Sequence, residues 1–354
     1  MPFISAPKLQ GSGIGFESMT SGTVKAGGPR VAVIGCGYWG SNHARTMASL
    51  GALVAVADHH HDRAEDLAVK LGVKAMAVAD IHAARDIDAV VLALPPQAHA
   101  ENALRAIEAG KHVLVEKPIA LNVADGETVV AAARAKGIVA MTGHVLRFHP
   151  AFERLLALVR SGELGDIRYV HSHRVGLGKF HTENDALWDI APHDISLILA
   201  VTGEAPSAIR GEGAATLDHL SDFAHLHLEF PSGVKGHVFT SRLNPYRERR
   251  LSVIGSGAMA VFDDVAPWPQ KLALYRHKVW RGEGGIQFEA AEPEFIAVPE
   301  EMPLTKECAH FLACITDDAE PVSDIAEGLE VLRILEAGTV RHDRTGAGRR
   351  LAAG

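Results

Sequence analysis

Three glycines, Gly35, Gly37 and Gly40, have a spacing that lets a chain bind phosphate through its backbone. They follow a short apolar run, Val31–Ile34, and precede Ser41–Leu50, which has the composition of a helix. In such a unit the first glycine allows a tight turn, the second lets the backbone approach a pyrophosphate, and the third lets helix pack on strand. The helix also directs N–H groups and its positive dipole end at the phosphates. A glycine turn can be purely structural, but the flanking elements favour a dinucleotide site.

A carboxylate follows the next apolar run at the distance expected for a ribose contact. Leu53–Ala57 has the composition of a second strand, and Asp58 comes directly after it, 18 residues past Gly40. A carboxylate there accepts hydrogen bonds from the adenine ribose and repels a 2′-phosphate, so Asp58 favours NAD over NADP. The alternative is that Asp58 caps a helix over Arg63–Leu71. The triplet His59–His61 either contacts a phosphate or, as we favour, faces water.

Polar side chains follow three further apolar runs of the first half. Because ligands of a parallel sheet lie beyond the carboxyl ends of its strands, these side chains are expected to meet at one edge. Lys117 could be an ordinary loop lysine, but its position directly after a buried strand makes it a candidate functional group. The side chains are Pro95 and Pro96 with His99, the tripeptide Glu116–Lys117–Pro118, and His144 with Arg147.

Another pair of titratable residues lies later in the chain, in the segment Trp188–Asp194. Asp189 and His193 are four residues apart, so a helical turn places them near one face. A carboxylate in that position can orient the imidazole or share its proton, as general acid–base chemistry requires. The alternative is a capping Asp beside a packed His. Pro192 suits the first turn of this helix, which we expect to continue through Val201.

The first half must position these groups with strands and helices in alternation. Continuously apolar strands that alternate with helices predict a parallel sheet covered on both faces, a doubly wound α/β fold of the Rossmann type. Beyond the two runs above, strands are expected at Val73–Val78, Ala89–Leu94, His112–Val115 and Ile138–Thr142, with helices at Gln97–Ala109 and from Asn122 to about Lys136.

The second half has a different pattern, which begins with an amphipathic helix opened by Pro150. Its strands are joined by short turns, and Phe223–Phe230 alternates apolar residues with His and Glu. This predicts an α+β domain with a large, mostly antiparallel open sheet. Strands are expected at Asp166–Arg174, Ala208–Ala214, Phe223–Phe230, Val234–Arg242, Arg249–Ile254 and Met259–Asp263, and helices near Leu304–Thr316 and Ile325–Ala337.

Five histidines of these strands suggest a metal site at first sight. His-x-His on a strand puts both imidazoles on one face, but no third ligand has a fixed spacing to them. We therefore predict no metal and interpret this face as a polar interface. The five are His171, His173, His225, His227 and His237.

Length and composition limit the class of protein. A chain of 354 residues is expected to form two domains, placed at 30–147 and 148–354 after a flexible extension over 1–29 that lacks the apolar run of a secretory signal. The net charge of −8 disfavours nucleic acid and anionic membrane surfaces, and no apolar run reaches the roughly 18–20 residues of a membrane span. Three cysteines without disulfide or zinc spacing predict a reducing, cytoplasmic setting.

The run Ala93–Leu121 (ALPPQAHAENALRAIEAGKHVLVEKPIAL) resembles the Gfo/Idh/MocA family of NAD(P)-dependent oxidoreductases, which act mostly on sugars, cyclitols and sugar nucleotides. The glycine turn, the Pro-Pro-His segment and the Glu-Lys-Pro tripeptide match in order and spacing. The resemblance implies that Lys117 is catalytic, that a cis peptide bond precedes Pro118, and that Asp189 and His193 belong to the active site. The predicted cofactor-binding set is Gly35, Gly37, Tyr38, Trp39, Gly40, Asp58, Pro95, His99, Glu116 and Lys117.

Gly143–Phe152 (GHVLRFHPAF), with Asn184–Trp188 in place of the paired glycines common in the family, resembles a branch associated with sugar-nucleotide 3-dehydrogenases. The expected reaction is hydride transfer between C3 of a nucleotide-linked sugar and nicotinamide, with His193 as the preferred base, Lys117 stabilising the alkoxide and Asp189 orienting the substrate or His193. The resemblance also implies a homodimer or homotetramer through the open sheet. Substrate contacts are predicted at Arg147, Lys179 and Asn184, with Tyr246, Arg247 and Arg249 as a further candidate for an anionic substrate group.

The sequence leaves three alternatives open. The substrate could be a free sugar or an inositol. The chain could be a non-catalytic dinucleotide-binding regulator, although the intact Lys117, Asp189 and His193 argue against this. It could also use transient oxidation to break a glycosidic bond with no net NAD turnover.

Overall fold

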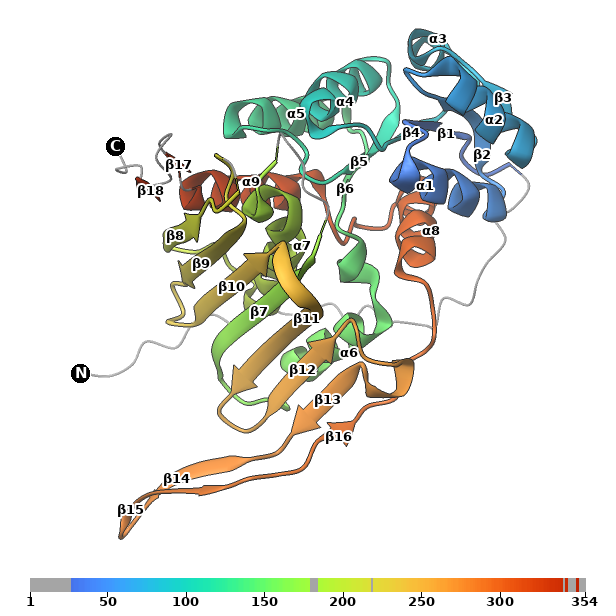
Figure 1. Ribbon diagram of the computed structural model, residues 1–354. Helices are drawn as coiled ribbons and strands as arrows, with labels where there is room; N and C mark the ends of the chain where they lie inside the picture. The colour runs from blue at the N-terminus through green and yellow to red at the C-terminus, as the bar shows by residue number, and fades with distance from the viewer. Residues whose placement is uncertain (1–26, 179–183, 218, 340, 343–347, 350–354) are drawn as a thin grey trace.

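The computed structural model describes residues 27–178, 184–217, 219–339, 341–342 and 348–349. The first half forms the expected parallel sheet, in the order β3-β2-β1-β4-β5-β6, with helices on both faces (Figure 1). The strand order reverses between β1 and β4, and a ligand of a doubly wound sheet lies beyond the strand ends at that point. The strands are β1 (Val31–Ile34), β2 (Leu53–Ala57), β3 (Lys74–Ala75), β4 (Ala89–Leu92), β5 (His112–Glu116) and β6 (Ala140–Gly143), and the helices are α1 (Tyr38–Ser49), α2 (His61–Leu71), α3 (Val78–Ala83), α4 (His99–Glu108) and α5 (Val123–Lys136).

The second half forms the predicted open sheet, in the order β16-β13-β12-β11-β7-β10-β9-β8. Its strands pair antiparallel except for β7 and β10, which are parallel. Helices α6 (Pro150–Arg160), α7 (Ala186–Thr202) and α9 (Ile325–Gly338) pack on one face. The strands are β7 (Ile167–Leu177), β8 (Ala208–Ala214), β9 (Phe223–Glu229), β10 (Lys235–Ser241), β11 (Leu243–Gly255), β12 (Met259–Asp263), β13 (Leu272–Tyr275) and β16 (Glu294–Phe295).

Three smaller pieces complete the described chain. A separate two-stranded hairpin, β14 (Lys278–Gly282) and β15 (Gly285–Glu289), projects from the β13–β16 edge (Figure 1). Short 3₁₀ turns follow β4, β6 and β12, at Pro96–Ala98, Val145–Phe148 and Trp268–Gln270. Two short strands, β17 (Arg341–His342) and β18 (Gly348–Arg349), pair near the C-terminus.

The last helices return to the first half of the chain. Helix α8 (Pro303–Thr316) packs on α1, so that Cys308, Phe311 and Leu312 join the core beneath the Rossmann sheet. Helix α9 lies between α5 and α7 and contributes to the cores of both halves. Two helices from the second half of the sequence therefore also pack against the first half.

Several elements differ from the sequence-based expectation: β11 begins six residues before the expected Arg249, strands β13 to β16 were not expected, and β3 and α7 have other bounds. The strand expected over Val73–Val78 is only Lys74–Ala75, because β3 is an edge strand that pairs with two residues of β2, and α3 follows it. Helix α7 begins at Ala186, six residues before Pro192, because the Asp185 carboxylate accepts a hydrogen bond from the Trp188 N–H (2.9 Å) and caps the helix there. Pro192 thus lies inside the helix, where it has no N–H to donate to the previous turn.

Residues 1–26, most of the predicted flexible extension, lie outside the described part of the chain. Within the part that is described, no helix is both long enough and apolar enough to cross a bilayer.

Candidate active site

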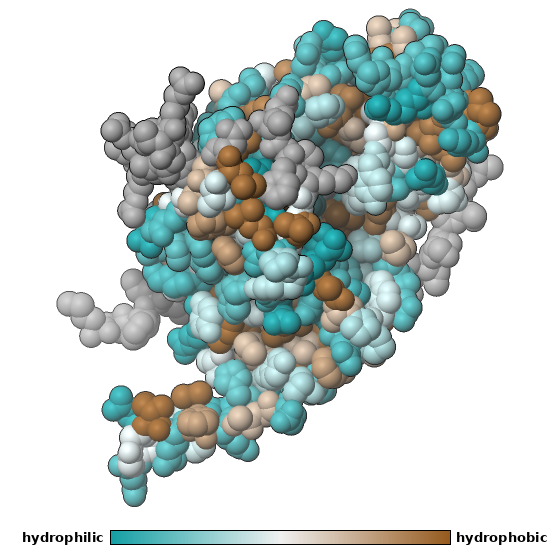
Figure 2. All heavy atoms as spheres, in the orientation of Figure 1, coloured by the Kyte–Doolittle hydropathy of each residue, from teal (hydrophilic) through white to brown (hydrophobic). Residues whose placement is uncertain are grey.

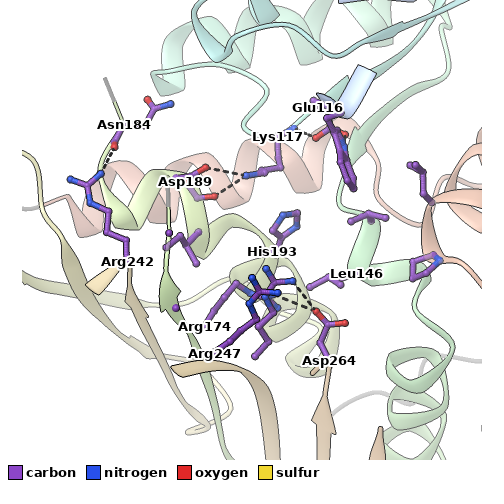
Figure 3. A pocket seen from close by; sticks show the side chains of 18 of the residues that line it. Glu116, Lys117, Leu146, Arg174, Asn184, Asp189, His193, Arg242, Arg247 and Asp264 are labelled. Carbon is purple, nitrogen blue, oxygen red and sulfur yellow. Dashed lines mark hydrogen bonds and ion pairs between the residues drawn. The ribbon is translucent and has the colours of Figure 1, made fainter. Parts of the chain in front are cut away.

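A cavity of about 1090 Å³ lies where the two halves meet. Its walls include Pro95 after β4, Lys117 after β5, His193 on α7 and Arg249 on β11. Figure 3 shows Lys117 and Asp189 on one side of His193, with Arg174, Arg247 and Asp264 on the other. The cavity thus lies beyond the carboxyl ends of the parallel strands, where a doubly wound sheet binds its ligand.

Lys117 is held in place from both halves of the molecule. Its ammonium nitrogen donates to the main-chain oxygen of Asp189 (2.7 Å) and lies 3.7 Å from that residue's carboxylate. Only 18% of its side chain is exposed. The Lys117–Pro118 peptide bond is cis, as the resemblance implied. The two segments are 72 residues apart in the chain, so this contact fixes α7 against the Rossmann sheet.

Glu116 helps to fix the position of Lys117. Its buried carboxylate accepts hydrogen bonds from the indole of Trp39, from His43 (2.7 Å) and from the Lys117 N–H (3.2 Å). Burial works to raise the pKa of Glu116, but the hydrogen bond and charge of His43, with Lys117 and Trp39, hold that pKa below its ordinary value. Glu116 is therefore an ionised anchor, and it joins α1 to the end of β5.

Asp189 and His193 lie on consecutive turns of α7, as their spacing predicted, and both line the cavity. Burial lowers the pKa of His193 well below its usual value, and the neighbouring Lys117, Arg174, His144 and Arg249 lower it further. The imidazole is consequently neutral near pH 7. Its Nδ1 atom is buried without a hydrogen-bond partner in the described structure. A neutral imidazole next to an ammonium group is suited to accept a proton from a hydroxyl that lies between them.

The glycine turn fits a dinucleotide, and each glycine has the predicted environment. Gly35 has φ +99°, and a Cβ there would lie 2.3 Å from the Ala93 carbonyl oxygen. A Cβ on Gly40 would lie 1.8 Å from the Gly35 carbonyl oxygen, so helix and turn touch through backbone. A Cβ on Gly37 would meet nothing within 4 Å, which leaves its outer side open for a phosphate. Ala93, against which the turn packs, also lines the cavity.

Asp58 braces the glycine turn from the neighbouring strand. Its carboxylate accepts hydrogen bonds from the N–H groups of Cys36 (2.6 Å) and His60 (2.8 Å). The guanidinium of Arg63 lies 3.6 Å away, at an exposed position on α2. The N-cap residue of α2 is His60, so Asp58 is not the N-cap of this helix, as the alternative interpretation supposed. Burial, with the charge of Asp58, raises the pKa of Cys36 to about 12, so this thiol stays protonated.

The structure separates the remaining predicted residues into four groups. Trp39, Pro95 and Asn184 line the cavity, whereas Tyr38 is exposed at the start of α1 outside its lining. Two residues predicted to contact a ligand bind other parts of the protein instead. His99 is fully buried between the carbonyl oxygens of Pro118 (2.6 Å) and Leu94 (2.7 Å), and Arg147 forms an ion pair with Glu327. Neither lines the cavity, so the direct ligand contacts expected of them have no support from their positions. Lys179 lies outside the described residues.

Sequence reasoning missed most of one cavity wall. Arg174 from β7, Arg242 between β10 and β11, and Lys271 before β13 face the same space as the predicted candidates Arg247 and Arg249. Arg174 and Arg242 pair with Asp194 (2.7 Å) and Asp222 (2.8 Å), whereas Asp264 lies 3.5 Å from Arg249. The only signal for this wall was the basic run Arg247–Arg250, because the other residues come from strands that the sequence does not show to be neighbours.

The fold and this site define a dinucleotide-dependent oxidoreductase with a substrate cavity between two domains. The chain belongs to the Gfo/Idh/MocA family: residues 29–144 match the model of the oxidoreductase family with an NAD-binding Rossmann fold, and residues 152–261 match the GFO/IDH/MocA C-terminal domain. The names of its relatives indicate dehydrogenases, and we treat the chain as one.

Three relatives indicate the range of substrates in its neighbourhood. UDP-N-acetylglucosamine 3-dehydrogenase of Acidithiobacillus ferrooxidans is 28% identical in sequence, over 86% of this chain and 94% of the relative. Its crystal structure superimposes with a TM-score of 0.76 at 26% identity, and the match covers 87% of this chain and 96% of that chain. The 4-carboxy-2-hydroxymuconate-6-semialdehyde dehydrogenase of Sphingobium sp. is 31% identical over 90% of this chain and 100% of the relative. The NAD-dependent scyllo-inositol 2-dehydrogenase of Bacillus subtilis is 29% identical over 64% and 71%.

Proposed function

We propose that this protein is an NAD-dependent dehydrogenase that oxidises a secondary alcohol of a nucleotide-linked sugar, at C3. The observation that carries the anionic part of the proposal is the cationic wall, defined as Arg174, Arg242, Arg247, Arg249 and Lys271. Figure 3 shows two of its members, Arg174 and Arg247, on the side of His193 that is opposite Lys117. A free sugar or inositol, the alternative, carries no charge for this wall to bind.

The cationic wall has more positive charge than its carboxylates balance. Its five cations face three carboxylates: Asp194 pairs with Arg174, Asp222 pairs with Arg242, and Asp264 lies 3.5 Å from Arg249 and 3.9 Å from Arg174. The Lys271 ammonium donates to the main-chain oxygen of Asp264. Burial and the charge of Arg174 lower the pKa of Arg249, which means that the charged form of Arg249 is destabilised in this position. A diphosphate placed there would offset that cost through charge-assisted hydrogen bonds. Arginine forks suit phosphate oxygens in particular.

The reacting end of the proposed site is the space between Lys117 and His193. Bound NAD would supply the nicotinamide ring that accepts the hydride. His193, neutral at working pH, accepts the hydroxyl proton, and the Lys117 ammonium donates a hydrogen bond to the same oxygen as negative charge develops on it. Asp189 keeps the ammonium in position through its main-chain oxygen and carboxylate.

NAD is the proposed cofactor, in preference to NADP, because Asp58 places a carboxylate at the end of β2 beside the glycine turn. Arg63 could favour a 2′-phosphate, but its ion pair with Asp58 partly neutralises it. We also propose a cytoplasmic setting, which the three free cysteines Cys36, Cys308 and Cys314 support.

We further propose that copies of the chain associate through the open face of the second sheet. This face carries Tyr169, His171 and His173 on β7 and His237 and Phe239 on β10, opposite the face that α6, α7 and α9 cover. Its aromatic rings already stack on one another, for example His225 on Phe239 at 4.5 Å. Within the described residues, no group of three or more His, Cys, Asp or Glu is placed to hold a metal ion.

The experiment is a screen for NADH or NADPH formation with UDP-sugars, free sugars and cyclitols. We expect oxidation of a sugar nucleotide with NAD, and little with NADP or with neutral sugars. Lys117→Met should keep NAD binding and lower kcat by about 10²–10⁴-fold, because it removes the donor to the developing alkoxide. Turnover of only neutral sugars or inositols would reject the nucleotide-linked substrate, and near-normal turnover by Lys117→Met would reject the catalytic assignment.

A further inference from the structure

His144 is a buried histidine to which the proposed reaction gives no role. It follows β6 directly, is the N-cap of the 3₁₀ turn Val145–Phe148, and has only 1% of its surface exposed. Both of its ring nitrogens are buried without a hydrogen-bond partner among the described residues. Burial and the charges of Arg147 and Lys117 lower its pKa to about 3, so the ring is neutral near pH 7. Because buried polar atoms are nearly always bonded to protein or to ordered water, water is expected at these nitrogens.

The fold places His144 next to both Lys117 and His193. Gly143 pairs with Glu116 across β5 and β6, so His144 and Lys117 follow two neighbouring strands at the same level. His144 is also one of the groups that lower the pKa of His193, which requires the two rings to be neighbours. His193 lines the cavity, whereas His144 does not. The ring of His144 therefore approaches His193 from within the protein.

A series of polar contacts joins the turn of His144 to the face of α7 that carries His193. The main-chain oxygen of His144 accepts a hydrogen bond from the Arg147 N–H (2.9 Å). The Arg147 guanidinium pairs with Glu327, whose carboxylate also accepts a hydrogen bond from the Ser196 hydroxyl. Ser196 lies three residues after His193 on α7, and residues at this spacing share a helix face. The Nε atom of Arg147 is buried without a partner among the described residues as well, so the unpartnered nitrogens of these three side chains lie in one region.

Proton transfer to His193 requires one particular tautomer of its ring. The ring lines the cavity while its Nδ1 atom is buried, so Nε2 is the atom that can reach a substrate hydroxyl. A neutral imidazole accepts a proton on Nε2 only when its own hydrogen is on Nδ1. That Nδ1–H is a buried donor, and a buried donor needs an acceptor. The group that supplies the acceptor therefore determines whether His193 can act as the base.

Among the described side chains whose charge acts on His193, His144 is the one that can accept this hydrogen bond. The others are cations, which can only donate, namely Lys117, Arg174 and Arg249. Asp189, one turn earlier on α7, lies against the Lys117 ammonium instead (3.7 Å; Figure 3). The neutral ring of His144 has one unprotonated nitrogen, which is an acceptor.

We propose that His144 is a positioning residue for His193 and acts through a buried water molecule that the two rings share with Arg147. The water accepts hydrogen bonds from His193 Nδ1–H and Arg147 Nε–H and donates one to the unprotonated nitrogen of His144, and three partners are typical of a buried water. This keeps the hydrogen of His193 on Nδ1 and leaves Nε2 free to accept the proton of the substrate alcohol. The resulting imidazolium keeps the same Nδ1–H bond, and no proton passes to His144. The inference rests on the proposed role of His193 as the base.

The tautomer of His193 is measured directly by NMR on the full-length protein with ¹⁵N-labelled histidine rings, at pH 8. The His193 signals are assigned by their loss in His193→Gln, and in the wild type we expect the hydrogen on Nδ1. His144→Phe keeps a ring of similar shape without nitrogens, and His193 should change to the Nε2–H tautomer. A wild type with the hydrogen on Nε2, or the same tautomer in both proteins, rejects the proposal. This readout needs no substrate, so it decides the inference even if no sugar nucleotide is oxidised, and the wild-type tautomer is decisive even if His144→Phe does not fold.

Kinetics with NAD and the best substrate from the screen separate positioning from packing. His144→Phe should lower kcat by about 10–100-fold and change KM by less than about twofold, since it removes part of what a positioned base contributes. His144→Gln, whose amide retains an acceptor and a donor, should recover kcat to within about fivefold of the wild type. His82→Phe, the same change at a half-buried histidine on α3 outside the cavity lining, should leave kcat unchanged. Equal losses in His144→Phe and His144→Gln, or a wild-type kcat in His144→Phe, would overturn the role of His144 while the proposed reaction stands.

Discussion

His193 is surrounded by cationic groups, and this determines the pH range in which it can act as a base. Because burial, Lys117, Arg174, His144 and Arg249 lower its pKa, the neutral form persists well below pH 6.5. A base must be unprotonated to act, so kcat/KM for alcohol oxidation should fall only at pH values below 6.5. Arg249→Gln removes one positive neighbour, raises the pKa of His193 and should move this acid limb to higher pH.

The measurement is the pH profile of kcat/KM from pH 4.5 to 9 for both proteins, with the best substrate from the screen. Arg247→Gln is the control, because it removes the same charge from the cationic wall without contributing to the pKa shift of His193. Both variants are expected to raise KM for an anionic substrate, but only Arg249→Gln should shift the limb. If the acid limb of the kcat/KM profile has the same pH midpoint in Arg249→Gln as in the wild type, this result would contradict the role of His193 as the base.

Glu307 is a second buried residue whose charge state has a measurable consequence. Its carboxyl is fully buried on α8 without a hydrogen-bond partner among the described residues, and burial, with the charge of Glu116, raises its pKa well above the usual value. The folded state therefore holds a proton that the unfolded state releases above about pH 4.3. By linkage, this group reduces stability as the pH rises, by up to about 1.4 kcal/mol per pH unit until the folded pKa is passed.

Glu307→Gln removes this titration and should gain stability relative to the wild type as the pH rises from 5 to 8. The difference in Tm between the two proteins, measured by differential scanning calorimetry, should grow from pH 5 upward until the folded pKa of Glu307 is passed and stay constant above it. Glu108→Gln, an exposed glutamate on α4, should show a constant difference. A pH-independent difference for Glu307→Gln would mean that its carboxyl is ionised in the folded protein.

At the scale of elements, two glycines of the β1–turn–α1 unit distinguish an effect on cofactor binding from an effect on folding. A substitution of Gly37 should weaken NAD binding, whereas a substitution of Gly40 should lower stability. Gly37→Ala adds a methyl group that meets nothing within 4 Å in the protein alone, and Gly37 has φ −65°, which alanine adopts without strain. We expect an unchanged Tm and at least tenfold weaker NAD binding, measured by titration calorimetry, because the methyl group occupies the space the pyrophosphate needs. Gly40→Ala should instead lower the Tm, since overpacking against backbone costs about 1–3 kcal/mol or more. Equal NAD affinity in Gly37→Ala and the wild type would reject the phosphate position.

The same elements explain what could be predicted from the sequence. The glycine turn, helix α5 with its Asn122 cap and strands β8, β9 and β12 follow from local patterns, and their bounds were close. The Lys117–Asp189 contact could not be derived from spacing, because it joins segments that only the tertiary fold brings together. Arg147 was assigned to substrate for the same reason: its partner Glu327 lies 180 residues later. The β14–β15 hairpin was missed because its exposed apolar residues (Figure 2) join none of the hydrophobic cores of the described residues.

At the scale of the whole molecule, the open face of the second sheet combines a surface suited to association with groups that titrate. Burial lowers the pKa of His171, His225 and His237, to about 4 for His237, and the other imidazoles of the face lower these values further. At pH 7 these rings are therefore uncharged, and the face can be buried between two copies at little electrostatic cost. His173 and His227 complete the cluster, and the charged side chains around it include Arg210, Glu212, Glu248 and Arg250.

Protonation of these rings would place like charges on both sides of the interface, and a buried charge is unfavourable. The dissociation constant of the oligomer should consequently be constant above pH 6.5 and rise as the pH falls from there toward 4, measured by sedimentation at fixed ionic strength. His225→Gln combined with His237→Gln should flatten this dependence, whereas His61→Gln, an exposed histidine on α2, should leave it unchanged. Because added salt screens the repulsion between exposed charges, the dependence should also weaken in 1 M salt. A dissociation constant that does not change between pH 7.5 and 4 would place the association on another surface.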